Sequence, residues 1–288
     1  MINRIQKLAK WKRAVLGIGD DCAVINHTKD KYLLLTIDML IEGVHFDLEN
    51  AGPKRVGRKA LAVSLSDIAA MGGVPKYCLV SVGLPPNMPV KVVDDFYAGF
   101  LKLAKEYGVE LIGGDTNRAE RFICDVCVVG EVEKRRLVKR SGAKIGDNIY
   151  VTGRLGGSIK SKQYDFIPRL KEARLLVRNF KINAMIDISD GLSSDLRHIA
   201  ESSNSGALIY EKDIPVSKDS SLKGALTDGE DFELLFTTPG DISEKILSKK
   251  LGVAVKKIGE IRPKKESVNI IYKSTEKREL KPTGFRHF

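Results

Sequence analysis

The sequence predicts an α/β protein built from two domains. Two observations support this fold class: strand and helix patterns alternate along the first half, and after a glycine-rich break the second half resumes mixed patterns. The chain of 288 residues is long enough for two such domains. Its apolar fraction of 43% and charged fraction of 30% are typical of folded globular proteins.

Apolar, β-branched runs in the first half are typical of strands. They are Tyr32–Ile37, which ends at Asp38, then Cys78–Leu84, Phe122–Gly130 and Asn148–Thr152. Apolar residues at helical spacing predict helices over Lys54–Met71 and Val90–Tyr107. Glycines end both helices, Gly72 and Gly73 the first and Gly108 the second.

A glycine-rich segment, Thr152–Ser161, interrupts this pattern and marks the start of the second half. Helices and strands are again predicted beyond it. They are a helix around Pro168–Asn179, an apolar segment Ala184–Ile188, a helix around Leu192–Ser202, a strand Phe232–Thr237, and mixed strand and turn over Val253–Ile258 and Val268–Tyr272.

Membrane and disulfide signals are weak. No apolar run approaches the ~18 residues of a membrane span, and the N-terminus has no hydrophobic signal core, so we expect a cytoplasmic protein without membrane contact. Four cysteines, Cys22, Cys78, Cys124 and Cys127, are too few for a disulfide framework, so reduced thiols are expected. Cys124 and Cys127 lie three apart in a predicted strand and point to opposite faces, which disfavours a metal or redox pair.

The formal net charge of +11 is compatible with nucleic acid, an acidic membrane surface or anionic small substrates. Basic clusters such as Lys134–Arg136 and Lys264–Lys265 have no interleaved aromatic residues of the kind that stack on bases. We therefore favour a solvated basic face and expect no nucleic-acid partner.

Aspartates recur where apolar strands or helices are expected to end, each with a small or hydroxyl-bearing neighbour. They are Asp20 and Asp21 after Gly19, Asp38 after Thr36, Asp67 after Ser66, Asp115 after Gly114, and Asp187 and Asp190 around Ser189. One such aspartate is usually a cap or turn residue, but five places in one chain indicate a shared role. Carboxylates that converge with hydroxyls suit Mg²⁺. Several magnesium ions bridging a polyphosphate would explain the set.

Glycines add a second signal for phosphate. Gly113 and Gly114 would let backbone N–H groups approach phosphate oxygens closely, just before Asp115. The sequence has no G-x-x-x-x-G-K-[ST] loop and no protein-kinase H-R-D or D-F-G set. A bound nucleotide must therefore be held by a different architecture.

A series of motifs runs along nearly the full chain. In order they are GIGDDCAV, TIDMLIEGVHF, KALAVSLSDIAAMGG, LIGGDT, VKRSGAKIGDNIYVTG, AMIDISDGLSSDL and DGEDFELLF. These motifs resemble those of the thiamine-monophosphate kinases, members of the aminoimidazole-ribonucleotide synthetase superfamily. The resemblance implies an aminoimidazole-ribonucleotide synthetase-like α/β (α+β) fold, with an ATP- and magnesium-binding domain over 1–140 and a domain over 141–288 that completes the active site. It also implies a homodimer built by joining the N-terminal mixed sheets of two subunits.

The same resemblance implies roles for individual residues. Magnesium ligands would be Asp21, Thr36, Ile37 through its backbone carbonyl, Asp38, Asp67, Asp115, Asp187 and Asp190. ATP, the co-substrate, would contact Tyr97, Gly114, Asp115, Arg140 and Ser189. Thiamine monophosphate would contact His45, Glu230 and, through an aromatic stack, Phe285. No general base is assigned, because the acceptor phosphate is already ionised at neutral pH.

Some alternatives stay open at this point. His45 is either a ligand or a packing residue, and Phe285 is either a stacking residue or a C-terminal plug for the core. The sequence departs from the family at Asp228, where a glycine usually precedes Gly229, and after Gly157, where a segment is shortened. A ribonucleotide cyclo-ligase or a selenophosphate synthetase of the same superfamily is the nearest rival, and a basic nucleic-acid-binding module is the rival from another class.

Overall fold

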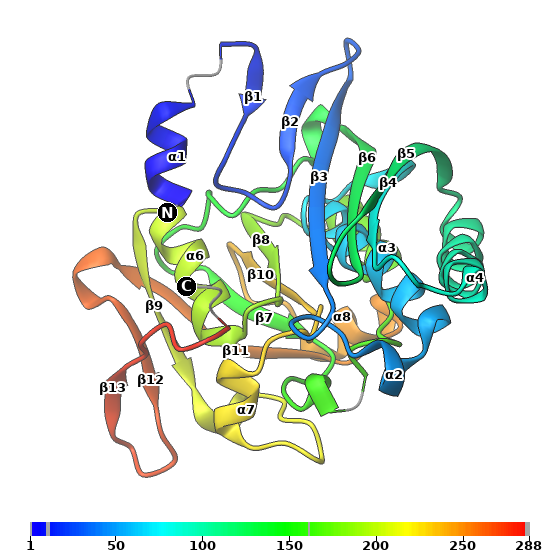
Figure 1. Ribbon diagram of the computed structural model, residues 1–288. Coiled ribbons are helices and arrows are strands. Elements are labelled where there is room, and N and C mark those ends of the chain that lie inside the picture. The colour runs from blue at the N-terminus through cyan, green and yellow to red at the C-terminus, as the bar shows by residue number, and fades with distance from the viewer. Residues whose placement is uncertain (1, 10–11, 161, 286–288) are drawn as a thin grey trace. The chain divides into compact units, whose positions relative to one another are not determined.

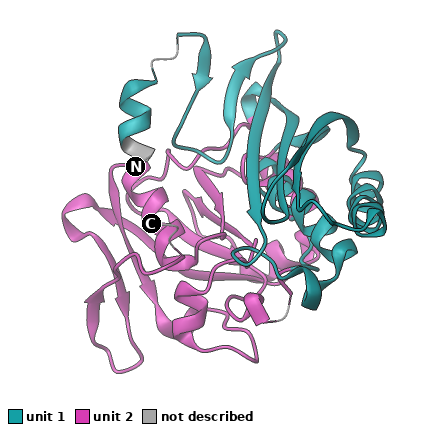
Figure 2. Cartoon of the chain, in the orientation of Figure 1, with its two compact units in different colours: residues 1–68, 73–135, 164–168 teal, residues 69–72, 136–163, 169–288 magenta. Residues whose placement is uncertain are grey.

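The computed structural model describes residues 2–9, 12–160 and 162–285 and contains two mixed sheets (Figure 1). The chain divides into two compact units, each holding one sheet (Figure 2). Unit 1 consists of residues 1–68, 73–135 and 164–168, and unit 2 of residues 69–72, 136–163 and 169–288. Two mixed sheets with helices agree with the predicted α/β (α+β) class.

Unit 1 is built on a sheet with the strand order β1-β2-β3-β6-β4-β5. Its strands are β1 Ala14–Leu16, β2 Ala23–Asn26, β3 Lys31–Ile41, β4 Val74–Leu84, β5 Glu110–Arg118 and β6 Ile123–Glu133. Its helices are α1 Ile2–Leu8, α2 Leu48–Ala51, α3 Pro53–Ala70 and α4 Val90–Tyr107. The β4–β5 pair is parallel and the other neighbouring pairs are antiparallel.

One face of this sheet is buried beneath α3. Alternate residues of β6 are buried, so Cys124 lies on the buried face and Cys127 on the other, as the alternation of a strand predicts. The helices α3 and α4 cross at glycines, because a Cβ at Gly57 would lie 1.9 Å from the Phe96 carbonyl oxygen and one at Gly99 would lie 1.9 Å from that of Lys54.

Unit 2 is built on a sheet with the strand order β13-β12-β9-β11-β7-β10-β8. Its strands are β7 Asn148–Thr152, β8 Ala184–Asp187, β9 Ser205–Tyr210, β10 Leu234–Thr238, β11 Val255–Pro263, β12 Val268–Ile271 and β13 Lys277–Glu279. Its helices are α5 Leu170–Asn179, α6 Leu192–Ser202, α7 Leu222–Thr227 and α8 Glu244–Leu251. The core joins the apolar face of α6, including Leu196, to Ile149, Ile186 and Leu235 of the sheet.

Most predicted elements are present, and three of them, Val90–Tyr107, Asn148–Thr152 and Leu192–Ser202, have the predicted bounds. The prediction that a strand ends at Asp38 is wrong, because β3 continues to Ile41. It can continue because a neighbouring helix supplies a hydroxyl to the Asp38 carboxylate. Among the described residues, no helix is long and apolar enough to cross a membrane.

Candidate active site

Asp38 lies inside β3, on the face that α3 covers. The Ser64 hydroxyl, on α3, donates a hydrogen bond of 2.7 Å to the Asp38 carboxylate. The pKa of Asp38 is raised to about 6. Burial is the largest cause, the Ser64 hydrogen bond opposes the shift, and the nearby carboxylates of Asp125 and Asp21 add to it. A carboxylate in this environment would gain from a cation beside it.

Thr36 and Asp67 lie close to this position. Thr36 is two residues before Asp38 in β3 and therefore shares its face, and its hydroxyl donates a hydrogen bond to the carboxylate of Asp67 on α3. Asp21 is 7% exposed, and it offers a carboxylate oxygen within 4.8 Å of one from Asp67. The structure thus brings together four of the predicted magnesium ligands from unit 1.

The buried thiol of Cys22 lies within electrostatic reach of several of these carboxylates. Burial raises its pKa well above the ordinary value, and the charges of Asp67, Asp21, Asp20 and Asp38 raise it further. The donors around it are hard oxygens, which Mg²⁺ prefers over sulfur or nitrogen. The chemistry of the donor set therefore fits magnesium.

Asp115 is not brought to the same face of the sheet as Asp38. Asp38 stands opposite Val126 in the register, whereas Asp115 stands opposite Ser81, which pairs with Asp125. Successive residues of a strand alternate faces, so Asp115 projects from the face away from α3. Its carboxylate accepts hydrogen bonds from the Thr116 backbone N–H at 2.8 Å and from the Asn117 side chain at 2.6 Å.

The glycine pair before Asp115 lies within β5, so the expectation that a strand or helix ends there is wrong. A Cβ at Gly114 would lie 1.8 Å from the carbonyl oxygen of Val80 on β4. Close approach of the parallel neighbour strand therefore requires glycine at this position, whatever else the backbone contacts. The side chain of Ile37 is 64% exposed, and this residue would reach a metal only through its backbone carbonyl.

His45 lies in a turn that follows β3. The Ile41 backbone N–H donates to His45 Nδ1 at 3.0 Å, so the neutral ring carries its proton on Nε2. Lys59, which is 0% exposed, donates from Nζ to the His45 carbonyl oxygen at 2.7 Å. The turn therefore fixes His45 in the tautomer whose Nε2–H can donate to an anion.

Tyr97 lies on α4 among aromatic side chains. Its ring makes edge contacts with Phe96 at 5.3 Å and Phe100 at 6.4 Å between ring centroids. Burial raises the pKa of its hydroxyl. The structure thus shows a packing role for Tyr97 in unit 1.

In unit 2, two loops lie side by side and carry most of the predicted residues. One, residues 188–191, follows β8, which ends at Asp187, and the other, residues 228–233, precedes β10. The Glu230 N–H donates to the Ser189 carbonyl oxygen at 2.7 Å, and Phe232 N–H donates to that of Ile188 at 2.8 Å. Backbone hydrogen bonds therefore hold Glu230 next to the segment of Asp187, Ser189 and Asp190.

The C-terminal segment joins these loops. The Phe285 backbone N–H donates to the Asp190 carbonyl oxygen at 3.1 Å, and the Phe285 side chain is 43% exposed. A Cβ at Gly284 would lie 1.9 Å from the same Asp190 oxygen, so the approach requires glycine. The last three residues of the sequence, 286–288, lie outside the described residues.

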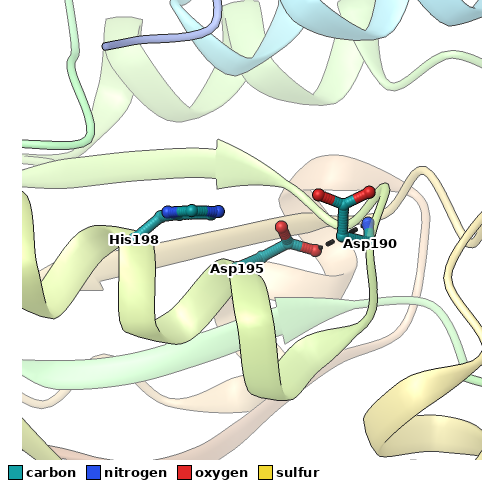
Figure 3. A group of neighbouring side chains, drawn as sticks. All are labelled: Asp190, Asp195 and His198. Atoms are coloured by element: carbon teal, nitrogen blue, oxygen red, sulfur yellow. Dashed lines mark hydrogen bonds between the residues drawn. The ribbon is translucent and has the colours of Figure 1, made fainter. Parts of the chain in front are cut away.

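Two neighbours of Asp190 were not predicted. Asp190, Asp195 and His198 offer ligand atoms within 4.8 Å of one another, and Figure 3 shows Asp195 and His198 on one helix, α6. Asp195 is 1% exposed and accepts a hydrogen bond of 3.1 Å from the Asp190 backbone N–H. The sequence did contain a signal for this pair: Asp195 and His198 are three residues apart within a predicted helix, and residues at that spacing share a helix face.

The charges that act on Asp195 also show where Arg140 lies. Burial raises the pKa of Asp195 well above the ordinary value, Asp190 and Asp187 raise it further, and the charge of Arg140 lowers it. The Arg140 carbonyl oxygen accepts a hydrogen bond from the Ser203 hydroxyl at 3.2 Å. Arg140 therefore lies within electrostatic reach of the carboxylates around Asp190.

Comparison with known protein families shows which fold the chain has. Residues 19–132 match the family model "AIR synthase related protein, N-terminal domain", and residues 144–271 match "AIR synthase related protein, C-terminal domain". The chain therefore has the two-domain fold of the AIR synthase related proteins, and the predicted fold class is confirmed.

Comparison with individual proteins shows to which family of AIR synthase related proteins the chain belongs. Thiamine-monophosphate kinase of Buchnera aphidicola (Schizaphis graminum) is 39% identical, covering 97% of this chain and 94% of that protein. The kinase of Bacillus subtilis is 36% identical over 95% and 93%. A solved structure described as "AaThiL complexed with AMPPCP and TMP" has a TM-score of 0.79 and 31% identity, covering 100% of this chain and 96% of that one. The chain belongs to the thiamine-monophosphate kinase family, which confirms the resemblance of the motifs.

Proposed function

We propose that the protein transfers the γ-phosphoryl group of ATP to thiamine monophosphate by direct in-line transfer, without a phosphoenzyme, giving thiamine diphosphate and ADP. The observation that carries this function is family membership across nearly the whole length, with curated relatives named thiamine-monophosphate kinase at 34–39% identity. The protein is then a phosphotransferase whose acceptor is itself a phosphate. AMPPCP and TMP in the related solved structure support ATP as the donor and thiamine monophosphate as the acceptor.

We assign the predicted carboxylates to magnesium. The gathering of Asp21, Asp38 and Asp67 with the Thr36 hydroxyl in unit 1 supports this assignment, and so does the raised pKa of Asp38. In unit 2 the assigned ligands are Asp187 and Asp190. Asp115 and the Ile37 carbonyl are also assigned to magnesium, with the Asp115 carboxylate on the other face of the unit 1 sheet from that of Asp38. Bound Mg²⁺ would offset the negative charge of the transferred phosphoryl group and of the leaving phosphate.

The remaining residues bind and orient the two substrates. His45, held with its proton on Nε2, donates to the acceptor phosphate, and Glu230 and Phe285 contact the thiamine portion. Arg140 and Ser189, with Tyr97 and Gly114, contact ATP. Because the acceptor oxygen is already ionised, the chain needs no general base, and positioning the two anions is its main task.

The test of this function is product formation. Purified protein with ATP, Mg²⁺ and thiamine monophosphate is expected to give thiamine diphosphate, separated by chromatography, and thiamine as acceptor is expected to give none. A ribonucleotide or selenide acceptor consumed in place of thiamine monophosphate would move the protein to another branch of the superfamily. An aspartyl phosphate trapped after incubation with ATP alone would contradict direct transfer.

We also propose that the protein is a homodimer joined through the open face of the unit 1 sheet. Large apolar side chains are exposed on that face, including Ile37 at 64%, Met39 at 52% and Leu79 at 41%. Ile37 and Leu79 both stand opposite Cys127 in the register and therefore form a continuous row. A second copy of the same sheet would cover this row, as the family resemblance implies.

Light scattering after size-exclusion chromatography tests the dimer. Met39→Glu is expected to shift the protein from dimer to monomer, because it places a charge opposite Asp125 within the proposed interface. Ile246→Glu on α8 is the matched control, since Ile246 is 57% exposed and lies in unit 2. A wild-type monomer, or dimer loss in both variants alike, would contradict the assignment.

We propose a cytoplasmic location on the basis of chemistry. The donor ATP is abundant there, and the four cysteines form no disulfide within the part of the chain that the structure describes. Reduced thiols suit that compartment. Fractionation of cells that produce the protein would test this location, and recovery with the membrane fraction would contradict it.

A further inference from the structure

We propose that Asp228, Asp231 and Glu233 form an anchoring group that positions Glu230 for acceptor binding. This inference rests on the proposed function, in which Glu230 contacts thiamine monophosphate. These carboxylates belong to the 228–233 loop, yet they turn toward the glycine-rich segment 152–158 and toward Arg169, all within unit 2. They act through the loop and not on the substrate, so they are positioning residues.

Asp231 anchors the middle of the loop. It is 1% exposed, and its carboxylate accepts hydrogen bonds from the Gly156 backbone N–H at 2.8 Å and from the Ser158 hydroxyl. The ammonium of Lys162 lies 3.8 Å from the same carboxylate. Burying a carboxylate costs desolvation free energy. These hydrogen-bond and ionic partners offset that cost only when the loop has this conformation.

Glu233 anchors the end of the loop. Arg169 donates to both of its carboxylate oxygens, each at 2.7 Å, in the paired geometry that gives the strongest carboxylate contacts. Thr152 also donates to this carboxylate at 2.7 Å, and its hydroxyl accepts from the Leu234 backbone N–H at 2.9 Å. The loop is therefore fixed at the point where it enters β10.

Asp228 anchors the start of the loop. Its carboxylate accepts a hydrogen bond from the Gly157 backbone N–H at 3.1 Å. This contact ties the glycine-rich segment to the loop that carries Glu230.

The backbone of the loop explains why anchors are needed. Glu230 and Phe232 have positive φ angles of 55° and 49°, which non-glycine residues adopt only at a cost. Such strained conformations persist only when several surrounding contacts hold the backbone in place. Anchors on both sides of Glu230 do this.

A double-mutant cycle tests this proposal. Ser158→Ala and Asp231→Asn are each expected to raise the KM for thiamine monophosphate by about 10-fold, the loss of one charge-assisted hydrogen bond. Their kcat and KM for ATP are expected to stay within about 2-fold of wild type. Glu230→Ala is expected to raise the same KM, and adding Ser158→Ala or Asp231→Asn to Glu230→Ala is expected to change it no further, because the anchors act through Glu230.

The outcomes separate this inference from the function it rests on. A wild-type protein that makes no thiamine diphosphate would contradict the proposed function and this inference with it. In an active protein, two results would overturn the anchoring role alone. One is a double variant whose KM for thiamine monophosphate rises by the product of the two single-variant increases. The other is a KM for thiamine monophosphate that none of the single substitutions changes. Ser158→Ala carries the test if Asp231→Asn does not fold, and Ser274→Ala, at an exposed hydroxyl of unit 2, is the control expected to leave both KM values unchanged.

Discussion

The two units hold their proposed ligands in different ways. In unit 1, Asp38 and Asp67 lie on a strand and a helix, and hydroxyls from neighbouring elements orient their carboxylates. In unit 2, Asp190 and Glu230 lie in loops that backbone hydrogen bonds and glycines hold together. A side-chain substitution in unit 1 should therefore remove a ligand without moving the chain, whereas a backbone change in unit 2 should move several ligands at once.

The largest effect is expected from Asp38→Asn in unit 1. Turnover should fall by at least roughly 10²-fold, because the variant loses a charged ligand at the proposed metal site. Stability should not fall, since burial raises the pKa of Asp38 to about 6 and the neutral side chain avoids that cost. Asp30→Asn, at an exposed aspartate, is the control, and near-normal activity of Asp38→Asn would contradict the metal assignment.

The next effect concerns the backbone of unit 2. Gly229 has a φ of 72°, and a Cβ there would lie 2.5 Å from the Ser189 carbonyl oxygen. Gly229→Ala should cost roughly 1–3 kcal/mol of unfolding free energy and raise the KM values for both substrates. Gly240→Ala, which meets no atom within 4 Å, should be nearly neutral. Equal unfolding midpoints for the two variants in urea would contradict the account of this loop.

A smaller effect should appear in the pH dependence of stability. Burial raises the pKa of Asp231 from 3.8 to about 6, opposed by Ser158, Gly156 and Lys162. Between these values the folded state keeps a proton that the unfolded chain loses, so the cost of this group grows as the pH rises from about 4 to about 6. The unfolding free energy of wild type minus that of Asp231→Asn should fall by on the order of 2 kcal/mol over this range. A difference that stays constant with pH would exclude this titration.

The smallest effect is expected at Phe285. Phe285→Ala should raise the KM for thiamine monophosphate by about 2- to 10-fold, the range of one lost aromatic contact. Its melting temperature should stay unchanged, because the side chain is 43% exposed. Val90→Ala, at a side chain that is 74% exposed, is the control. A lowered melting temperature with an unchanged KM would instead make Phe285 a plug for the core.

Sequence patterns predicted the regular elements better than the contacts between them. Helices such as Val90–Tyr107 were predicted with the correct bounds, because their apolar spacing and terminal glycine are local signals. The strand β5 was not predicted, since its polar, glycine-containing sequence lies at an exposed sheet edge. The end of β3 was misplaced because Ser64, which permits Asp38 within the strand, is distant in sequence.

For the proposed site, too, the sequence predicted individual residues better than the contacts between them. The aspartate series and the family motifs led to the carboxylates around Asp38 and to the loop of Glu230. The contacts of Asp231 with Ser158 and of Glu233 with Arg169 join residues 64 or more positions apart, and no local pattern predicts such pairs. Asp195 and His198 were also missed, although both lie on the predicted helix Leu192–Ser202.

The most direct test of direct phosphoryl transfer is a single-turnover experiment with protein in excess over ATP labelled at the γ-phosphorus. In the presence of Mg²⁺ and thiamine monophosphate, the label should pass from ATP to thiamine diphosphate without appearing on the protein. Omitting Mg²⁺ or the acceptor should leave it on ATP. Label that is released as inorganic phosphate while thiamine monophosphate stays unmodified, or label that becomes bound to the protein, would contradict the proposed reaction.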